Sequence, residues 1–323
     1  MSMRDEGGPV AVIEHRTWGD WPSVRLSTEA VELEVVSEVG ARVVSLRDRR
    51  REREWLVQGR KPRELEQMDW AQEGIVFGGR ESFGWDECLP TTSACADPTA
   101  PDGPPLRDHG DQWGRGAYLA LDHEQGAVEH TWGVPRWDYR LHRRLSFSDP
   151  ETVLAEYVLE SHADRPLPVS WAQHSVIAAE PGSYIDLPEV HTAQRTWQHG
   201  IDLPRELSWP RATAADGRER DLGCVRTGEG WAAVLYADPR EGARVVAPDG
   251  ARLDFEWDRD FAPALRVWLS YGGWPPGEAP SEQIALEPCT SMHDDLAAAL
   301  AAGEAHTLPP AGTLRWWVRL RLS

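Results

Sequence analysis

Alternation of apolar and polar residues with a period of two is the feature that most constrains the fold of this 323-residue chain. It is clearest over residues 137–147, where one face carries Trp137, Tyr139, Leu141, Leu145 and Phe147. Arg143 interrupts this face, and the other face carries Asp138, Arg140, His142 and Arg144. The pattern predicts a strand with one solvated face, which is typical of antiparallel sheets.

The same alternation recurs along the chain. It predicts strands over residues 31–38, 41–46, 152–160, 169–177, 231–236, 243–247, 252–257, 264–271 and 313–322. Proline-bearing segments at residues 95–107 and 203–217 are predicted to be loops. The chain is therefore predicted to be mostly β, with antiparallel sheets and few short helices, and to form a single domain over residues 1–323.

Helical periodicity is confined to a short segment near the C-terminus. Ser291 is the predicted N-cap, with Asp294 at the capping-box position. Leu296 and Leu300 fall on one side of this helix, and Gly303 is placed to end it.

Charge and cysteine content narrow the function classes. The chain has 34 Lys and Arg against 53 Asp and Glu, a net charge of −19, which argues against nucleic acid or an anionic membrane surface as partner. The N-terminus lacks the apolar core of a signal peptide, and no segment has membrane-spanning length, so a cytoplasmic location is expected. Cys88, Cys95, Cys224 and Cys289 form no C-x-x-C pair; we expect free buried thiols, with a disulfide left open.

Glu287 and His174 are the first two candidate site residues. Glu287 lies between the apolar residues 284–286 and Pro288, at the predicted mouth of a buried strand, where a carboxylate must be either paired or functional. His174 lies in the predicted strand over residues 169–177, on a face with small neighbours that leave room for a ligand. The alternative for His174 is a core histidine bonded to a backbone carbonyl.

The second group of candidates lies around a proline-rich loop and a turn-rich segment. His109 ends the loop, and the following Gly110 permits close approach of the backbone to a ligand, with Trp113 nearby; a solvated polar turn is the alternative. Trp85 and its acidic neighbours suit sugar stacking or an ordinary surface. Seventeen tryptophans favour carbohydrate mildly, but most, including Trp268, alternate as core residues do.

Several familiar catalytic templates are absent from the sequence. It contains no G-x-S-x-G elbow, no P-loop, no H-E-x-x-H and no G-x-G-x-x-G between a strand and a helix. The pair His109 and Asp111 lacks further ligands at metal-site spacing, so no metal is expected. Hydrolase, nucleoside triphosphatase and dehydrogenase functions are therefore disfavoured.

Taken in order, short motifs along nearly the whole chain resemble the aldose 1-epimerase (galactose mutarotase-like) superfamily. They are GARVVSLRD at residues 40–48, GGRESFGWDECLP at residues 78–90, His109-Gly110, Gln173-His174-Ser175, Leu286-Glu287-Pro288 and LPPAGT at residues 308–313. Each motif is short, and their order and spacing carry the resemblance.

The resemblance implies an antiparallel β-supersandwich with a sugar cleft and no cofactor. It implies Glu287 as general base, His174 as general acid, His109 as holder of a substrate hydroxyl and Arg80 as a substrate-binding arginine. The family's substrate-binding aspartate has no clear counterpart, and Asp202 and Asp186 are nominated for it. Trp85 and Trp113 are the aromatic candidates for sugar contact.

The leading hypothesis is therefore an isomerase of carbohydrate metabolism, an aldose 1-epimerase that interconverts the α and β anomers of a sugar or sugar phosphate. The alternative is a non-catalytic carbohydrate-binding protein on the same scaffold. A third hypothesis, a β-sandwich lyase or metal-dependent isomerase, predicts stoichiometric metal. The expected partner is a small-molecule sugar, and the sequence leaves the oligomeric state open.

Overall fold

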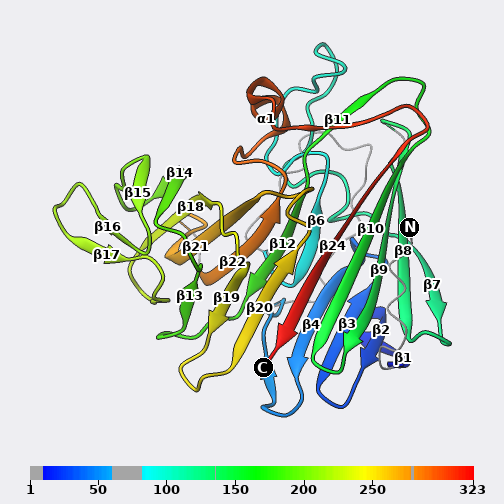
Figure 1. Cartoon of the computed structure of the whole chain (residues 1–323), viewed down its shortest axis with the longest axis horizontal. Helices are drawn as coiled ribbons and strands as arrows, with labels where there is room; N and C mark the ends of the chain where they lie inside the picture. Colours follow the sequence, from blue (N-terminus) through cyan, green and yellow to red (C-terminus); the bar gives the residue numbers. More distant parts are fainter. Residues whose placement is uncertain (1–9, 60–81, 135, 278–279) are drawn as a thin grey trace.

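Two large antiparallel sheets dominate the computed structural model, which describes residues 10–59, 82–134, 136–277 and 280–323 (Figure 1). The twelve-stranded sheet runs in the order β1 (Val12–Trp18), β2 (Trp21–Ser27), β3 (Val31–Val36), β4 (Arg42–Asp48), β6 (Trp85–Cys88), β12 (Ala172–Ile177), β22 (Ser281–Cys289), β21 (Ala264–Trp274), β18 (Trp231–Ala237), β14 (Thr192–His199) and β15 (Glu206–Ser208), with β5 (Arg53–Glu54) beside β4. The fold is therefore mostly β, as predicted.

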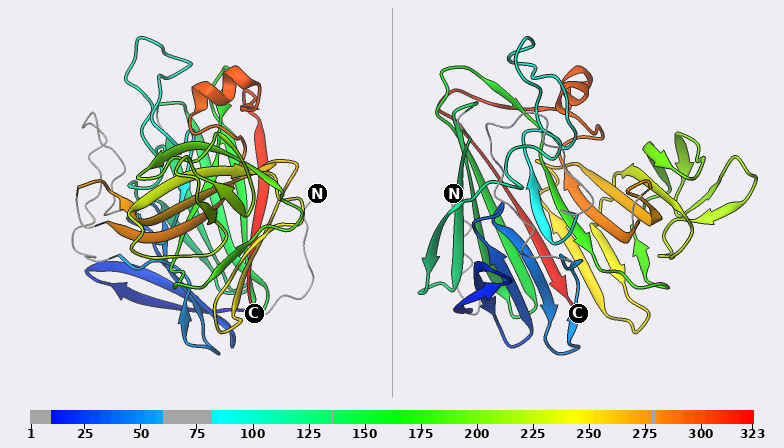
Figure 2. Two further views of the ribbon diagram at one scale, coloured as in Figure 1. Left: turned by 90° about the vertical axis from the view of Figure 1, so that its left-hand side faces the viewer. Right: turned by 180° about the vertical axis from the view of Figure 1, so that it is seen from behind.

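The eight-stranded sheet packs against the first, and one apolar core contains residues from both sheets. Its order is β13 (Tyr184–Asp186), β19 (Ala243–Val246), β20 (Arg252–Trp257), β24 (Thr313–Leu322), β10 (Thr152–Ser161), β9 (Tyr139–Asp149), β8 (Ala127–Val134) and β7 (Tyr118–Asp122). In the right-hand view of Figure 2, which shows the molecule from behind, the blue strands β1–β4 lie nearer the viewer than this sheet, so the two sheets form a sandwich. Two ribbons complete the fold, β11 (Leu167–Val169) with β23 (His306–Leu308) and β16 (Arg211–Thr213) with β17 (Glu219–Asp221).

Alternation along β9 confirms the strand predicted from the sequence. Its inward side chains, Tyr139, Leu141, Arg143, Leu145 and Phe147, are all buried. Trp137 is also buried but precedes the strand. A long apolar core between the sheets is the result, and β24 contributes to it in the same way, with Trp316 buried and Trp317 half-buried.

A single carboxylate ties the two sheets together inside this core. Glu87 is fully buried and accepts hydrogen bonds from the Trp85 indole (3.1 Å), the Arg143 guanidinium (3.0 Å), the Tyr157 hydroxyl (2.9 Å) and the Trp171 indole (3.0 Å). The Arg143 guanidinium lies over the rings of Trp85 and of Trp132, 5.5 and 5.3 Å from their centroids. The arginine that interrupts the apolar face is thus the partner of a buried glutamate.

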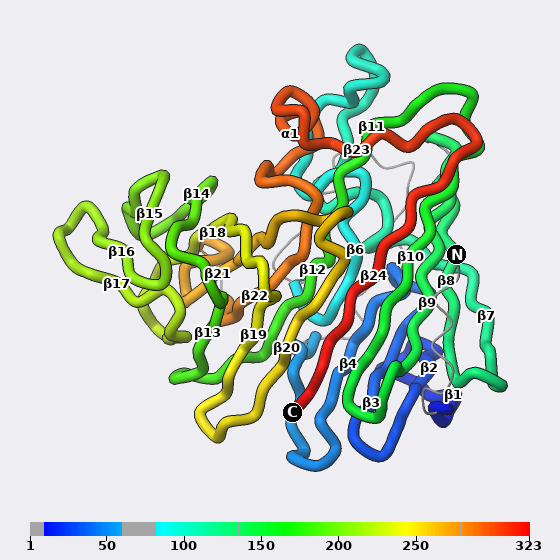
Figure 3. The backbone as a smooth tube through the Cα atoms, viewed as in Figure 1, coloured from blue at the N-terminus to red at the C-terminus, as the bar shows by residue number. Residues whose placement is uncertain are grey.

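The predicted C-terminal helix exists, but its cap differs from the prediction. Helix α1 (Leu296–Ala302) is capped by Asp295, whose carboxylate accepts from the Ala298 amide at 2.8 Å. Gly303 ends it with a left-handed φ of 75°. Leu296 is buried whereas Leu300 is 45% exposed, so the helix buries a narrower face than the prediction assumed. The tube in Figure 3 shows α1 at the same end of the molecule as the loop after β6.

Three other boundaries differ from the sequence predictions. Residues 203–217 are not one loop, because β15 and β16 both lie within them. The predicted strand over residues 169–177 is divided at residues 170–171 into the end of β11 and the whole of β12. Glu287 lies inside β22 and not at the mouth of a strand. No helix in the described part of the chain has the length and apolar character needed to span a bilayer.

Candidate active site

Strand register brings distant polar residues into one row across the middle of the twelve-stranded sheet. Asp86 pairs with His174 between β6 and β12, and Arg266 pairs with Glu287 between β21 and β22. The pairs on either side of His174 in β12 and β22, Ala172 with Cys289 and Val176 with Ala285, set His174 across from Glu287. Residues directly opposite one another share a face of a sheet.

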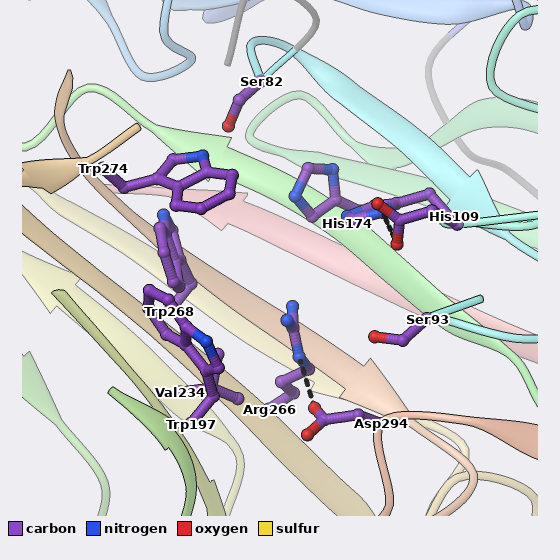
Figure 4. A pocket seen from close by; sticks show the side chains of 11 residues that line it. Ser82, Ser93, His109, His174, Trp197, Val234, Arg266, Trp268, Trp274 and Asp294 are labelled. Atoms are coloured by element: carbon purple, nitrogen blue, oxygen red, sulfur yellow. Dashed lines mark hydrogen bonds and ion pairs between the residues drawn. The ribbon is translucent and has the colours of Figure 1, made fainter. Parts of the chain in front are cut away.

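This row borders a cavity of about 300 Å³ on the face of the sheet that points away from the main core (Figure 4). Its polar lining consists of Ser82, Ser93, Asp108, His109, His174, Arg266 and Asp294. Its apolar lining consists of Trp197, Val234, Trp268 and Trp274. A wall of aromatic rings facing a set of hydrogen-bonding groups is the composition of a site for a small, partly polar ligand.

The two histidines meet in this cavity. The ring centroids of His109 and His174 are 4.9 Å apart, with the planes at 77°. The Nδ1 atom of His109 lies 3.0 Å from the Asp108 carboxylate. Burial lowers the pKa of His109, against the upward effect of Asp108. His109 is therefore expected to be largely neutral at neutral pH, able to donate or accept one hydrogen bond through the second ring nitrogen.

Gly110 explains how the loop holds His109 in place. Gly110 has φ 75°, and a Cβ there would lie 2.1 Å from the Leu89 carbonyl oxygen, so only glycine fits. The adjacent Asp111 amide donates to the same carbonyl at 2.9 Å. The close approach that the sequence suggested is thus made to the backbone after β6 and not to a ligand.

His174 is held from behind by a buried ion pair. Its Nδ1 atom is 2.8 Å from Asp86 Oδ1, and the Arg42 guanidinium donates to Asp86 Oδ2 at 2.7 Å. Asp86 and Arg42 are both fully buried, and His174 is 3% exposed. Burial raises the pKa of Asp86, but Arg42 and His174 more than offset this effect and hold the pKa below its ordinary value. Asp86 is therefore ionised at neutral pH.

Glu287 is paired to the arginine beside it. Arg266 Nη1 donates to both Glu287 oxygens, at 2.6 and 2.8 Å, and Arg266 Nε lies 3.5 Å from Asp294 Oδ1. The hydroxyl of Tyr236 donates to the same Asp294 oxygen at 2.9 Å. Burial lowers the pKa of Arg266, but Glu287 and Asp294 raise it well above its usual value. Arg266 lines the cavity while the fully buried Glu287 lies beneath it.

Three tryptophans form the aromatic wall. The ring centroids of Trp197 and Trp268 are 5.6 Å apart, those of Trp197 and Trp274 are 5.7 Å apart, and those of Trp268 and Trp274 are 6.2 Å apart. Figure 4 shows these rings facing His174 across the cavity. Trp268 is thus a cavity residue and not the main-core residue that its alternation suggested, because Leu265, Val267 and Leu269 occupy the core face of β21.

Three sequence candidates lie outside the cavity lining, which corrects their predicted role in sugar contact. Trp85 is fully buried on the opposite face of the sheet, bonded to Glu87. Trp113 is 4% exposed, and its indole donates to the Asp108 carbonyl at 3.0 Å, so it supports the loop of His109. Asp202 is exposed in the turn after β14, where Gln198 donates to it at 3.3 Å. The other nominated aspartate, Asp186, pairs with Arg244 at 3.5 Å in the β13–β19 pair.

Arg80 lies outside the described residues. The four cysteines are free, as predicted, but Cys95 and Cys224 are only half-buried, whereas all four were predicted to be buried. Cys88 and Cys289 are buried, and burial raises the pKa of both thiols above the ordinary value. No three His, Cys, Asp or Glu side chains in the described part of the chain gather as metal ligands would.

Sequence reasoning missed several cavity residues. Alternation along β21 places Ala264, Arg266 and Trp268 on one face and the apolar Leu265 and Val267 on the other, and this contrast was the available signal for Arg266 and Trp268. Alternation along β6 likewise separates Asp86 and Cys88 from Trp85 and Glu87. Asp294 was interpreted as part of a helix cap, and its position beside Arg266 had no local signal.

Comparison with solved structures identifies the fold. A galactose mutarotase-like protein from Clostridium acetobutylicum aligns with a TM-score of 0.65 and 13% identity, over 97% of this chain and 98% of that protein. A candidate aldose 1-epimerase from Escherichia coli K12 aligns with a TM-score of 0.61 and 14% identity, over 97% and 99% of the two chains. A second candidate aldose 1-epimerase, from Klebsiella pneumoniae, aligns with a TM-score of 0.64 and 14% identity, over 96% of this chain and 83% of that protein.

At the level of sequence, no family model and no curated protein matches the chain. The identities of the three structural neighbours are low, so the alignments establish architecture alone. The fold is a galactose mutarotase-like β-sandwich, in agreement with the fold predicted from the motifs.

Proposed function

We propose that the cavity binds a monosaccharide and interconverts its α and β anomers. The observation that supports this function best is the meeting of His109, His174 and the Arg266–Glu287 pair on one side of a cavity whose other side is tryptophan. A pyranose has hydroxyls on its edges and apolar C–H faces, which match these two sides. The fold shared with candidate aldose 1-epimerases agrees with this function.

In the proposed reaction, Glu287 accepts the proton of the anomeric hydroxyl while His174, in its doubly protonated form, gives a proton to the ring oxygen. The C1–O5 bond breaks as the C1–O1 double bond forms, giving the open-chain aldehyde. After rotation about C1–C2, the aldehyde closes on its other face, and each proton returns along the same route. His109 holds a substrate hydroxyl. Each transfer is general acid or base catalysis by a residue type suited to neutral pH.

The Arg266 contact leaves Glu287 able to act as a base. Arg266 reaches both carboxylate oxygens through one nitrogen, Nη1, whereas an ionised carboxylate has about four lone-pair positions. Because Glu287 is fully buried beneath Arg266, the anomeric hydroxyl must approach at the edge of this ion pair. In this function Arg266 holds the Glu287 carboxylate in place and contacts the sugar beside it.

Burial of Glu287 also favours the second candidate, a sugar-binding protein without catalysis. A carboxylate that is fully buried and bonded to an arginine through both oxygens is a stable structural pair, and the aromatic wall binds a sugar equally well without proton transfer. Sugar binding without faster anomer exchange is the result that separates this candidate from an epimerase.

Anomer exchange measured by NMR over hexoses, pentoses and their 6-phosphates tests the proposal. We expect the wild-type protein to accelerate exchange, most strongly for unphosphorylated sugars, because Arg266 is the single arginine or lysine among the described lining residues and already contacts Glu287 and Asp294. Saturable binding by calorimetry with no acceleration for any sugar would establish the binding-only function. The absence of both sugar binding and accelerated exchange would refute the two candidate functions.

Substituting alanine for Trp268 is expected to weaken sugar binding by about 10-fold or more. Trp268 stands at the centre of the aromatic wall, and an aromatic contact contributes about 0.5–1.5 kcal/mol beyond the area it buries. Calorimetric titration with the best sugar of the panel measures the change. Trp317→Ala is the matched control, because Trp317 lies half-buried on the outer face of β24, and its binding is expected to equal that of the wild type. Equal affinity in both variants would show that the sugar does not contact the aromatic wall.

A further inference from the structure

A buried ion pair, Arg42 with Asp86, lies behind His174, and neither of its members is a lining residue of the cavity. Arg42 and Asp86 are both 0% exposed and meet at 2.7 Å, and the second Asp86 oxygen holds His174 Nδ1 at 2.8 Å. The three residues come from adjoining positions on β4, β6 and β12. They form a chain from arginine to carboxylate to imidazole that ends at the cavity.

The backbone before β6 packs closely against Arg42. Arg42 also donates to the Phe83 carbonyl at 3.2 Å and lies 4.5 Å above the centroid of the Phe83 ring. Gly84 has φ 68°, and a Cβ there would lie 2.5 Å from the Val43 carbonyl oxygen and 3.3 Å from Arg42 Cγ. Glycine is therefore required at position 84 for β6 to pass Arg42 this closely. A buried ion pair costs desolvation energy that apolar residues of similar volume would avoid, so its presence calls for a specific role.

We propose that Asp86 and Arg42 are positioning residues for His174. Asp86 accepts a hydrogen bond from Nδ1–H, which fixes the ring orientation and the Nδ1–H tautomer and assigns Nε2 to the exchange of protons with a ligand. Arg42 holds Asp86 ionised and oriented. A histidine whose remote nitrogen is bound by a carboxylate has one tautomer selected, and its protonated form is stabilised when it carries the transferred proton.

Other charged or titratable groups also surround His174. His109 contacts it on the same side of the cavity, with 4.9 Å between the ring centroids, and Glu287 and Arg266 lie on the next two strands of the row. Because Arg266 and Glu287 neutralise one another, and burial lowers the pKa of His109, Asp86 is the carboxylate that acts on the His174 ring directly.

The tautomer is measurable without knowing the substrate. Long-range ¹H–¹⁵N NMR of the imidazoles is expected to show neutral His174 with its proton on Nδ1 in the wild-type protein. The double variant Arg42→Met/Asp86→Leu replaces both charges by apolar side chains and so avoids leaving one charge buried alone. In it, the preference for Nδ1–H is expected to be lost while the circular dichroism spectrum stays that of the wild type. The Nε2–H tautomer in the wild type, or an unchanged tautomer in the double variant, would overturn the proposal.

A kinetic test rests on the proposed anomer exchange. Asp86→Asn removes the charge but keeps an oxygen, and kcat is expected to fall about 10- to 100-fold with KM little changed, because substrate contacts remain. Asp254→Asn is the matched control; Asp254 lies on β20, pairs with Arg244 of β19 and Arg252 of β20 outside the site, and kcat should be unaffected. A change in KM alone would contradict a positioning role. Absence of exchange in the wild type refutes the proposed function, whereas the tautomer measurement still decides this inference.

Discussion

Replacement of Glu287 by glutamine is expected to lower the rate of anomer exchange at least 10²-fold, because general base catalysis by one side chain contributes about 10²–10⁴-fold. Glutamine has nearly the same size and still accepts a hydrogen bond from Arg266, so the variant should remain folded. Sugar affinity should change much less than the rate, since Arg266 and not Glu287 lines the cavity. NMR exchange and calorimetry on the same samples measure both quantities.

Glu256→Gln is the matched control for this substitution. Glu256 lies on β20 and pairs with Arg319 at 3.5 Å on an exposed surface, so its loss is expected to leave exchange unchanged. If Glu287→Gln retains wild-type exchange, Glu287 is a structural partner of Arg266 and not the base. If both variants lose exchange equally, the effect is not specific to the site.

Replacement of Glu87 by alanine is expected to destabilise the protein by about 3–5 kcal/mol, the range for breaking a buried ion pair by removing one partner. Arg143 would remain 0% exposed without its carboxylate, and the indoles of Trp85 and Trp171 and the hydroxyl of Tyr157 would lose their acceptor. Because Glu87 joins the two sheets, the loss should appear in cooperative unfolding of the whole chain. Denaturant titration followed by tryptophan fluorescence measures it.

The double variant Glu87→Leu/Arg143→Met separates charge from packing. Burial raises the pKa of Glu87 in spite of Arg143 and Tyr157, so the ion pair does not fully offset its desolvation. We therefore expect the double variant to be more stable than Glu87→Ala, since no lone charge remains buried. A double variant as unstable as the single one would assign the loss to the tryptophan and tyrosine hydrogen bonds.

Much of the fold could be predicted from sequence because period-two alternation reports directly which side chains face a core. The strand over residues 252–257 and that over residues 313–322 agree with β20 and β24 to the residue. Alternation reports two faces but not which face borders a cavity. Trp85 was therefore expected at the ligand and is in the core, whereas Trp268 was expected in the core and lines the cavity.

Neighbours within the site could not be predicted from local sequence because they depend on pairing between distant strands. His174 Nδ1 bonds Asp86, which is 88 residues away, and Arg42 is a further 44 residues from Asp86. The family motifs pointed to Glu287 and His174, and β12 and β22 do place them on adjacent strands. The arginine that covers Glu287, Arg266, comes from a third strand, β21, and none of the family motifs lies on that strand.

The central position of β12 and β22 has a consequence for how this protein loses function. Both strands are hydrogen-bonded on both sides, so His174 and Glu287 belong to the interior of the largest sheet and not to its edges. Interior strands open only with the whole structure, whereas loops and edges open locally. Loss of any activity of this site by heat or denaturant should therefore coincide with global unfolding, and a partly unfolded chain that has frayed at β1 or β15 should retain His174 and Glu287 in register.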